Sequence, residues 1–154
     1  MSTLQELKDR KSVRKFTNQP VSQETKKMLT EAALQAPTAG NQVLYSILDI
    51  TDSSIKEKLA IYCDNQPFIA DAPVVYVFVA DHERWNKIYL SADCKPRPCG
   101  PADAWLAQAD ACIAAQNMVV AAHSLGLGSC YIGDIIENGE KVKIIFSEHL
   151  ADIK

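Results

Sequence analysis

The stretch Arg10-Lys11-Ser12-Val13-Arg14-Lys15-Phe16 places four cations and one hydroxyl directly behind a short amphipathic segment at the N-terminus. Guanidinium groups and a hydroxyl suit a phosphate monoester, because charge-assisted hydrogen bonds to its oxygens are shorter and stronger than neutral ones. A basic turn in solvent has the same composition, and the cluster alone favours that simpler interpretation. The stretch therefore predicts a local anion site only if a second motif supports it.

That second motif is Ala36-Pro37-Thr38-Ala39-Gly40-Asn41-Gln42, which combines a helix stop, small residues for close approach and two amides. Together the two stretches resemble the nitroreductase family of FMN-dependent oxidoreductases. In that family Arg-x-Ser-x-Arg/Lys is followed, after one helix, by Pro-Ser/Thr-x-x-Asn-x-Gln or a close variant. The matching residues are Arg10, Ser12 and Arg14, then Pro37, Thr38 and Asn41.

The resemblance extends over almost the whole chain. It continues through residues 66–75, which begin Gln66-Pro67-Phe68, through residues 110–117, and through the glycine-containing residues 125–133. No single motif is highly specific, but five motifs in the family's order argue against coincidence. Family members usually continue beyond this point with a further strand and a late Lys or Arg, so the resemblance implies that the usual C-terminal extension is lacking here.

Size and composition predict one ordinary globular domain over residues 1–154. Hydrophobic residues make up 47% of the chain and charged residues 23%, with no low-complexity tract. The net charge of −3 argues against general nucleic-acid binding, which relies on broad basic surfaces. Neither an apolar stretch of about 20 residues nor a signal-peptide pattern is present, so we expect a cytoplasmic protein without membrane association.

The five cysteines form an odd count, so free thiols are expected. Cys112 and Cys130 lie in apolar runs and are predicted to be buried. Cys94 and Cys99 share one loop, but no nearby His/Cys pair supplies further ligands, so no metal site is expected. The three histidines lack partners at a recognisable spacing, which argues against a hydrolytic triad.

Hydrophobic periodicity predicts helices over residues 3–10, 23–36, 54–63, 103–125 and 140–147, and strands over residues 43–51, 73–80 and 129–132. Thr3-Leu4-Gln5-Glu6 has the form of a capping box, and Ser54 with Glu57 predicts a second cap. Gly126 is the natural stop of the longest helix. Residues 73–80 form a continuous apolar run, which is typical of a central strand.

Three details complete the expected architecture. Trp105, Cys112 and Ile113 count among the apolar positions that suit close packing of the long helix, and such a tryptophan is more often core than ligand platform. Residues 81–85 read as the start of a surface helix.

The resemblance implies an α+β, nitroreductase-like fold, with a central, mainly antiparallel sheet flanked by helices. It also implies a homodimer that uses the long helix as interface.

The resemblance also implies FMN at that interface. Arg10 and Ser12 would hold the phosphate and ribityl chain with help from Lys11. Arg14 would point toward the N1–C2=O edge of the ring system, where a fixed cation stabilises the charge of reduced flavin. The remaining implied contacts are Pro37, Thr38, Ala39 and Asn41 from the other subunit, Gln66 at the ring edge, and the backbone of Ile132 and Gly133 facing flavin N5 and O4.

The implied activity is reduction of nitroaromatic, quinone or similar planar acceptors by a ping-pong cycle, with NADH or NADPH as electron donor and no catalytic side-chain nucleophile. Two alternatives stay open: a non-catalytic flavin-binding protein for storage or sensing, and a related flavin chemistry such as reductive dehalogenation. Simpler structural roles also remain for single residues, such as Asn41 in a turn or Gly133 at a change from strand to loop.

Overall fold

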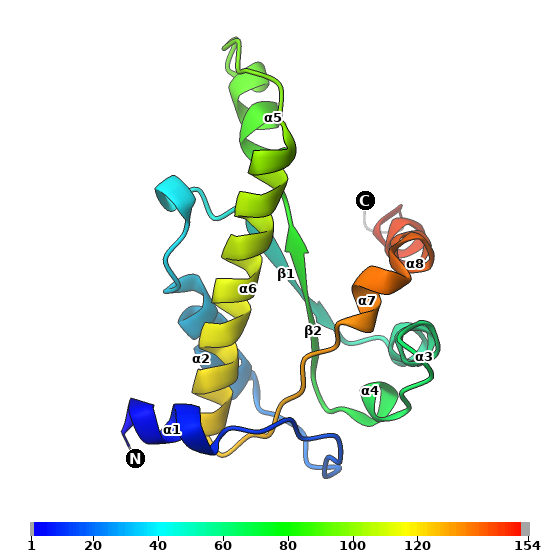
Figure 1. Ribbon diagram of the computed structural model, residues 1–154. Coiled ribbons are helices and arrows are strands. Elements are labelled where there is room, and N and C mark those ends of the chain that lie inside the picture. The colour runs from blue at the N-terminus through cyan, green and yellow to red at the C-terminus, as the bar shows by residue number, and fades with distance from the viewer. Residues whose placement is uncertain (1, 152–154) are drawn as a thin grey trace.

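The computed structural model describes residues 2–151, with side chains as far as residue 146. Figure 1 shows a small sheet between two groups of helices. The elements are α1 (Thr3–Asp9), α2 (Gln23–Leu34), η1 (Ala39–Asn41), β1 (Tyr45–Ile50), α3 (Ser53–Tyr62), α4 (Phe68–Asp71), β2 (Val75–Ala80), α5 (Arg84–Ser91), α6 (Pro101–Ser124), α7 (Asp134–Glu137) and α8 (Gly139–Ala151). Within this range no helix has the length and apolarity needed to cross a bilayer.

The sheet consists of β1 and β2, which pair antiparallel from Tyr45 opposite Ala80 to Ile50 opposite Val75. Successive side chains of a strand point to opposite faces. Tyr45 and its same-face neighbours pack against α2 and α6, whereas Ile50 and Val75 pack on the other side, against the group formed by α3, α4 and α8. Both faces are therefore apolar, which is why the second strand reads as a continuous hydrophobic run.

Small residues bring α2 and α6 close together on the first face. Ala33 and Ala114 are fully buried, and Leu29 and Met118 fill the space around them. Alanines at a helix contact allow the backbones to approach, so a 24-residue helix can lie flat on both α2 and the sheet. The second core is built from Ile55 and Leu59 of α3 together with residues of α4 and α8.

The predicted α+β fold with an antiparallel sheet between helices is confirmed, but two helix starts were assigned to the wrong caps. The side chain of Ser2, and not that of Thr3, accepts the hydrogen bond that opens α1, from the N–H of Gln5. Asp52 likewise caps α3 in place of Ser54, because its carboxylate accepts the N–H groups of Ser54 and Ile55. Carboxylate and hydroxyl side chains cap helices about equally well, so residue type alone does not distinguish Asp52 from Ser54.

The predicted strand at residues 129–132 is wrong. This segment makes one isolated parallel bridge, between Ser129 and Ser12, and then turns into the short helix α7. In the described part of the chain the sheet therefore has two strands, and β2 is paired along one edge only instead of being central in the sheet. Strand pairing needs a partner of matching length, and a lone bridge does not extend a sheet.

The predicted burial of Cys112 and Cys130 is also wrong, since Cys112 is exposed and Cys130 half-buried. Trp105, interpreted as core, has 76% of its surface exposed. The buried side of α6 consists mostly of alanines, and Trp105, Cys112 and Ile113 face outward. An alanine-rich helix is apolar around its whole circumference, so its periodicity cannot indicate which face is buried.

Candidate functional site

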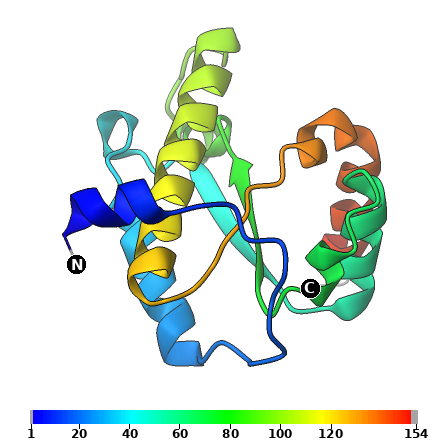
Figure 2. The ribbon, with the colours of Figure 1, turned by 60° about the horizontal axis from the view of Figure 1, so that its bottom comes forward.

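The cationic stretch lies across the loop that follows α6, as Figure 2 shows. The Val13 N–H donates to the Ser129 carbonyl at 2.9 Å, beside the bridge between Ser12 and Ser129. The backbone of the cationic stretch is thereby fixed against the loop that leads to Ile132 and Gly133, although the two segments lie far apart in the sequence.

Gly128 makes this crossing possible. A Cβ atom at this position would lie 2.8 Å from Cβ of Val13, which is closer than real Cβ atoms approach one another. The absence of a side chain therefore sets the distance between the two segments.

The cations of this stretch make no ion pair with any residue that the structure describes. Arg10 is half-buried, and Lys11, Ser12 and Arg14 are exposed. Elsewhere several cations are neutralised, for example Lys26 by Asp49 at 2.8 Å. A concentration of unneutralised positive charge favours an anionic ligand.

Tyr131, in the loop after α6, is within the electrostatic influence of Arg10. Burial raises the pKa of this phenol, the charge of Cys112 adds to the effect, and the charge of Arg10 partly opposes it. The positive charge of the stretch is therefore felt at the loop that carries the predicted flavin contacts.

Ile132 and Gly133, the predicted backbone contacts, lie directly before α7. Gly133 is the N-cap of α7, and a Cβ atom built on it would meet nothing within 4 Å. Among the described residues the N–H groups of Ile132 and Gly133 have no hydrogen-bond acceptor. Two adjacent free N–H groups beside open space can donate to the polar edge of a ligand.

Gln66 lies near this loop, but its amide is already engaged. Its Nε2 donates to the Cys63 carbonyl at 2.8 Å and to Oδ2 of Asp134 at 2.9 Å. Gln66 thereby ties the turn after α3 to the first residue of α7, directly after Gly133. Any contribution of Gln66 to a ring-edge contact would use its remaining carbonyl oxygen.

The second predicted motif forms a tight loop at the end of α2. Oγ1 of Thr38 accepts the Val43 N–H at 3.2 Å, and the Ala39 N–H donates to Oδ1 of Asp110 at 3.0 Å. Pro37 and Asn41 are exposed on its surface. In Figure 1 this loop, which contains η1, lies beside the upper half of α6, whereas residues 10–16 lie near the lower end.

Arg10, Lys11, Ser12 and Arg14 thus belong to the segment that crosses the loop after α6, and Ile132 and Gly133 lie at the end of that loop, where Gln66 binds Asp134. The structure places Pro37, Thr38, Ala39 and Asn41 in a separate loop of the same chain.

Three residues that hold the second loop were not assigned a role from the sequence, namely Asp110, Arg84 and Trp85. Nη1 of Arg84 donates to the Val43 carbonyl at 2.8 Å, and Nε1 of Trp85 donates to the Gln42 carbonyl at 2.7 Å. A signal existed for Asp110, because it is a lone carboxylate in the middle of an alanine-rich helix. Arg84 and Trp85 gave no comparable signal.

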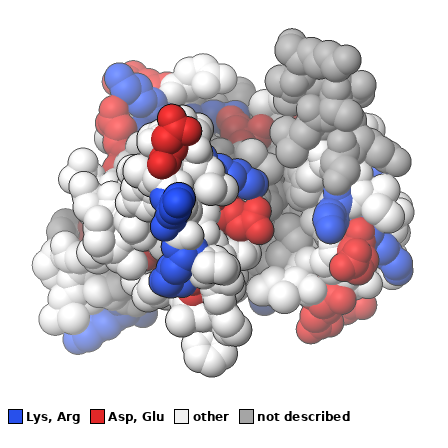
Figure 3. Space-filling view, turned by 90° about the horizontal axis from the view of Figure 1, so that it is seen from above, with Lys and Arg blue, Asp and Glu red and all other residues white. Residues whose placement is uncertain are grey.

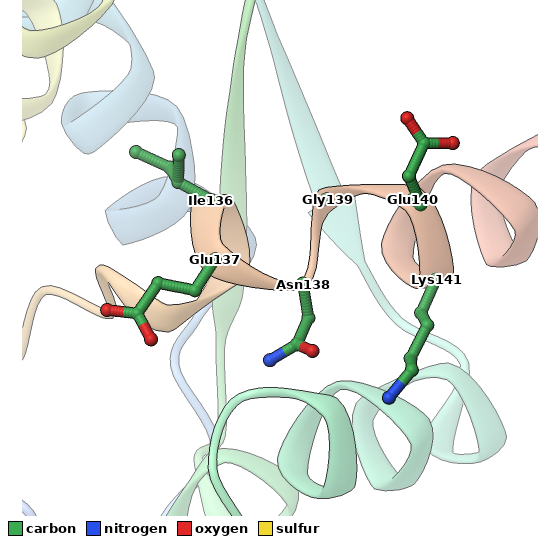
Figure 4. A pocket seen from close by; sticks show the side chains of 6 residues that line it. All are labelled: Ile136, Glu137, Asn138, Gly139, Glu140 and Lys141. Atoms are coloured by element: carbon green, nitrogen blue, oxygen red, sulfur yellow. The ribbon is translucent and has the colours of Figure 1, made fainter.

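Two open hollows lie elsewhere. One, of about 330 Å³, is formed by residues 136–141 where α7 meets α8. Figure 4 shows Lys141 pointing toward α3, where its Nζ lies 5.7 Å from the centre of the Tyr62 ring, while Glu140 points away. The other, of about 280 Å³, lies between α5, the start of α6 and the second loop, and includes Trp85 and Tyr89. Figure 3 looks down on this end, where acidic and basic side chains are scattered among uncharged ones.

The fold and the site define an α+β protein in which helices enclose a small antiparallel sheet and a cationic stretch crosses a loop that ends with two free backbone N–H groups. The model of the nitroreductase family matches residues 7–150, and the chain belongs to this family.

Relatives with assigned names support this classification. An NADPH-dependent oxidoreductase of Staphylococcus epidermidis is 35% identical over 143 residues, which cover 92% of this chain and 57% of the relative. A protein of the same name from Staphylococcus aureus is 33% identical over 141 residues, covering 90% of this chain and 56% of the relative.

Solved structures agree. NfrA1 nitroreductase from B. subtilis superposes with a TM-score of 0.90 at 30% identity, covering 95% of this chain and 60% of that one. The NADPH:FMN oxidoreductase from Vibrio harveyi, complexed with NAD+, gives a TM-score of 0.82 at 28% identity, covering 92% and 61%. The chain therefore spans less than two thirds of the length of each of these relatives.

Proposed function

We propose that this protein binds FMN and uses NADPH or NADH to reduce small planar acceptors. One observation carries the proposal: a stretch of unneutralised cations and a hydroxyl is hydrogen-bonded to Ser129, in the loop that ends with the free N–H groups of Ile132 and Gly133. FMN has a phosphate at one end and a polar ring edge at the other, so its chemistry fits both parts of this site. The names of the Staphylococcus and Vibrio relatives point the same way.

The chain's own residues divide the binding between them. Arg10 and Ser12, assisted by Lys11, hold the phosphate and ribityl chain through charge-assisted hydrogen bonds. Arg14 lies further along the same stretch and sets a positive charge near the N1–C2=O edge of the ring. The N–H groups of Ile132 and Gly133 donate to the edge that carries N5 and O4.

Bound FMN supplies the capacity to accept a hydride from NADPH or NADH and pass electrons to a second substrate. The protein's task is to orient the ring, neutralise its charge and leave one face open. Planar acceptors such as nitroaromatics and quinones suit an open ring face, and donor and acceptor occupy it in turn, which gives ping-pong kinetics. No side-chain nucleophile is needed.

We further propose that the working form is a homodimer built on α6. The outward face of this helix carries Trp105, Leu106 and Ile113, which are 76%, 47% and 41% exposed. An apolar helix face of this kind marks an interaction surface. A two-fold dimer would let Pro37, Thr38, Ala39 and Asn41 of one subunit cover the flavin held by the other.

The test is a visible absorbance spectrum of gently purified protein, followed by FMN titration and an assay of NADPH oxidation with a quinone acceptor. We expect a yellow protein that releases FMN and oxidises NADPH only when flavin is bound. Tight FMN binding without NADPH oxidation would favour the non-catalytic flavin-binding alternative. A protein that neither contains nor takes up FMN would overturn the proposal.

A further inference from the structure

Asp110 is the one buried charged residue in the described part of the chain. Its exposed fraction is 3%, and it lies near the middle of α6 among buried alanines. Burying a carboxylate is costly unless its oxygens accept hydrogen bonds. A buried charge in an otherwise apolar helix therefore calls for a specific partner.

The partners of Asp110 are two backbone N–H groups of the second loop. Oδ1 accepts from Ala39 at 3.0 Å, and Oδ2 accepts from Leu44 at 3.4 Å. No cation that the structure describes forms an ion pair with this carboxylate. Its charge is felt nearby, because the pKa of Tyr45 is raised first by burial and then by Asp110. The carboxylate thus joins both ends of the segment between residues 39 and 44.

That segment has an unfavourable backbone conformation. Gly40, Asn41 and Val43 have φ angles of 57°, 56° and 50°. Glycine and asparagine tolerate this left-handed region, but a β-branched residue such as Val43 is an outlier there. Such conformations persist only when the surrounding structure holds them, and they concentrate at functional sites.

The carbonyl groups of the same segment accept hydrogen bonds from α5 and from the turn before it. Trp85 donates to the Gln42 carbonyl at 2.7 Å and Arg84 to the Val43 carbonyl at 2.8 Å. The Asp81 N–H donates to the Leu44 carbonyl at 2.8 Å. Asp110 accepts the N–H groups at the two ends of the segment, and Oγ1 of Thr38 accepts the Val43 N–H between them. The loop is therefore held by groups of distant elements together with one side chain of its own.

We propose that Asp110 is a positioning residue, which holds the Ala39 and Leu44 N–H groups so that the strained loop presents Thr38 and Asn41 to the flavin of the partner subunit. The effect on flavin binding rests on the proposed function. The two hydrogen bonds from the Ala39 and Leu44 N–H groups to Asp110, called the clamp below, are a property of the chain itself. An Asp110→Asn side chain keeps one acceptor oxygen and turns an NH₂ group toward the other N–H, so one hydrogen bond is replaced by repulsion.

The first measurement is amide hydrogen exchange of the flavin-free protein. In Asp110→Asn we expect at least one of the Ala39 and Leu44 amides to exchange about tenfold faster, as expected for one lost buried hydrogen bond. The matched control is Asp71→Asn on α4, an exposed carboxylate whose side chain makes no hydrogen bond or ion pair with the residues that the structure describes. Unchanged exchange in Asp110→Asn would overturn the clamp.

The second measurement is FMN affinity. We expect the dissociation constant of Asp110→Asn to rise roughly tenfold, equivalent to about 1.4 kcal/mol, with the Asp71→Asn value unchanged. If the unmodified protein does not bind FMN, the proposed function fails while the exchange measurement still decides the clamp. If it binds FMN and Asp110→Asn binds equally well, the positioning role is overturned.

A Val43→Gly background distinguishes positioning from general destabilisation. Glycine adopts the left-handed conformation without strain, so the clamp has less to hold. We expect Asp110→Asn to weaken FMN binding by no more than about threefold there, against tenfold alone. Equal losses of affinity in both backgrounds would contradict the positioning role.

If Asp110→Asn does not fold, amide exchange of the unmodified protein tests the clamp instead. Slow exchange of the Ala39 and Leu44 amides would support it, and exchange at the rate of an open loop would overturn it.

Discussion

Gly128 acts through its missing side chain rather than through backbone freedom, since its φ lies outside the left-handed region. It lets the cationic stretch lie against the loop that carries Ile132 and Gly133. At the scale of single residues, the site thus depends on one contact between segments far apart in the chain.

We expect Gly128→Ala to destabilise the protein by about 1–3 kcal/mol, the usual range for overpacking, because the added Cβ would lie 2.8 Å from Val13. FMN binding should weaken as the cationic stretch moves away. Urea unfolding and flavin titration measure the two effects. Gly139→Ala is the matched control, because nothing lies within 4 Å of a Cβ at that position. Equal behaviour of the two variants would contradict this account.

The two arginines of the cationic stretch should differ in what they control. Arg10→Ala removes a phosphate contact and should raise the FMN dissociation constant by roughly tenfold or more. Arg14→Ala should mainly lower the flavin reduction potential, because it removes a positive charge beside the reduced ring. Flavin titration and spectroelectrochemistry separate the two quantities. If both variants changed both quantities equally, this division of roles would be wrong.

At the scale of elements, the start of α6 is fixed by an ion pair as well as a cap. Asp103 accepts two hydrogen bonds from Arg97, at 2.7 and 2.6 Å, and one from the Gly100 N–H at 2.7 Å. The Arg97 guanidinium, and after it the Gly100 N–H, hold the pKa of Asp103 well below its ordinary value of 3.8. The loop before α6 is thereby tied to the helix that carries Asp110 and Trp105.

This arrangement predicts a pH dependence. A carboxyl whose pKa is lowered by folding stabilises the protein above its unfolded pKa, and the contribution is lost as pH falls. The melting temperature of the unmodified protein should exceed that of Asp103→Asn by a constant few degrees above about pH 5 and by less below about pH 4. Because Arg97 is largely exposed, high salt should reduce the difference. A difference independent of pH down to pH 2 would refute the assignment.

Helices and strands were predicted correctly where hydrophobic periodicity sets their bounds, and incorrectly where contacts with distant segments determine whether they form. The bounds of α2, α6 and β2 follow from apolar spacing, Pro37 and Gly126, whose φ is 77°. The segment at residues 129–132 has the composition of a strand, yet among residues 2–151 its one bridge partner is Ser12. Composition is a property of one segment, whereas a strand forms only when a second strand pairs with it through backbone hydrogen bonds.

At the scale of the whole molecule, the outward face of α6 carries several large apolar side chains, two glutamines and no exposed charged residue. The chain uses the alanines of this helix for its own core and leaves Trp105 and Ile113 to solvent. Association through this face would cover them and would bring the two groups of predicted flavin contacts, which are separate in one chain, into a common site.

The dimer prediction has a matched pair of variants. Ile113→Glu on α6 and Ile144→Glu on α8 replace helical isoleucines that are 41% and 58% exposed. We expect the first to shift the molar mass from dimer to monomer and to weaken FMN binding, and the second to leave both unchanged, because only α6 is proposed to form the interface. Light scattering coupled to size-exclusion chromatography measures the mass. A monomeric unmodified protein, or equal effects of both variants, would contradict the interface.

The sequence by itself determined the α+β class, the order of most elements, the family resemblance and the segments expected to bind flavin, because periodicity, helix stops and charged motifs are local properties. Only the tertiary structure decided that α6 turns its alanines inward and Trp105 outward, that Gln66 binds Asp134, and that Asp110 holds the loop between Ala39 and Leu44. These outcomes depend on which distant surfaces meet, and an apolar helix or a lone carboxylate does not specify its partner.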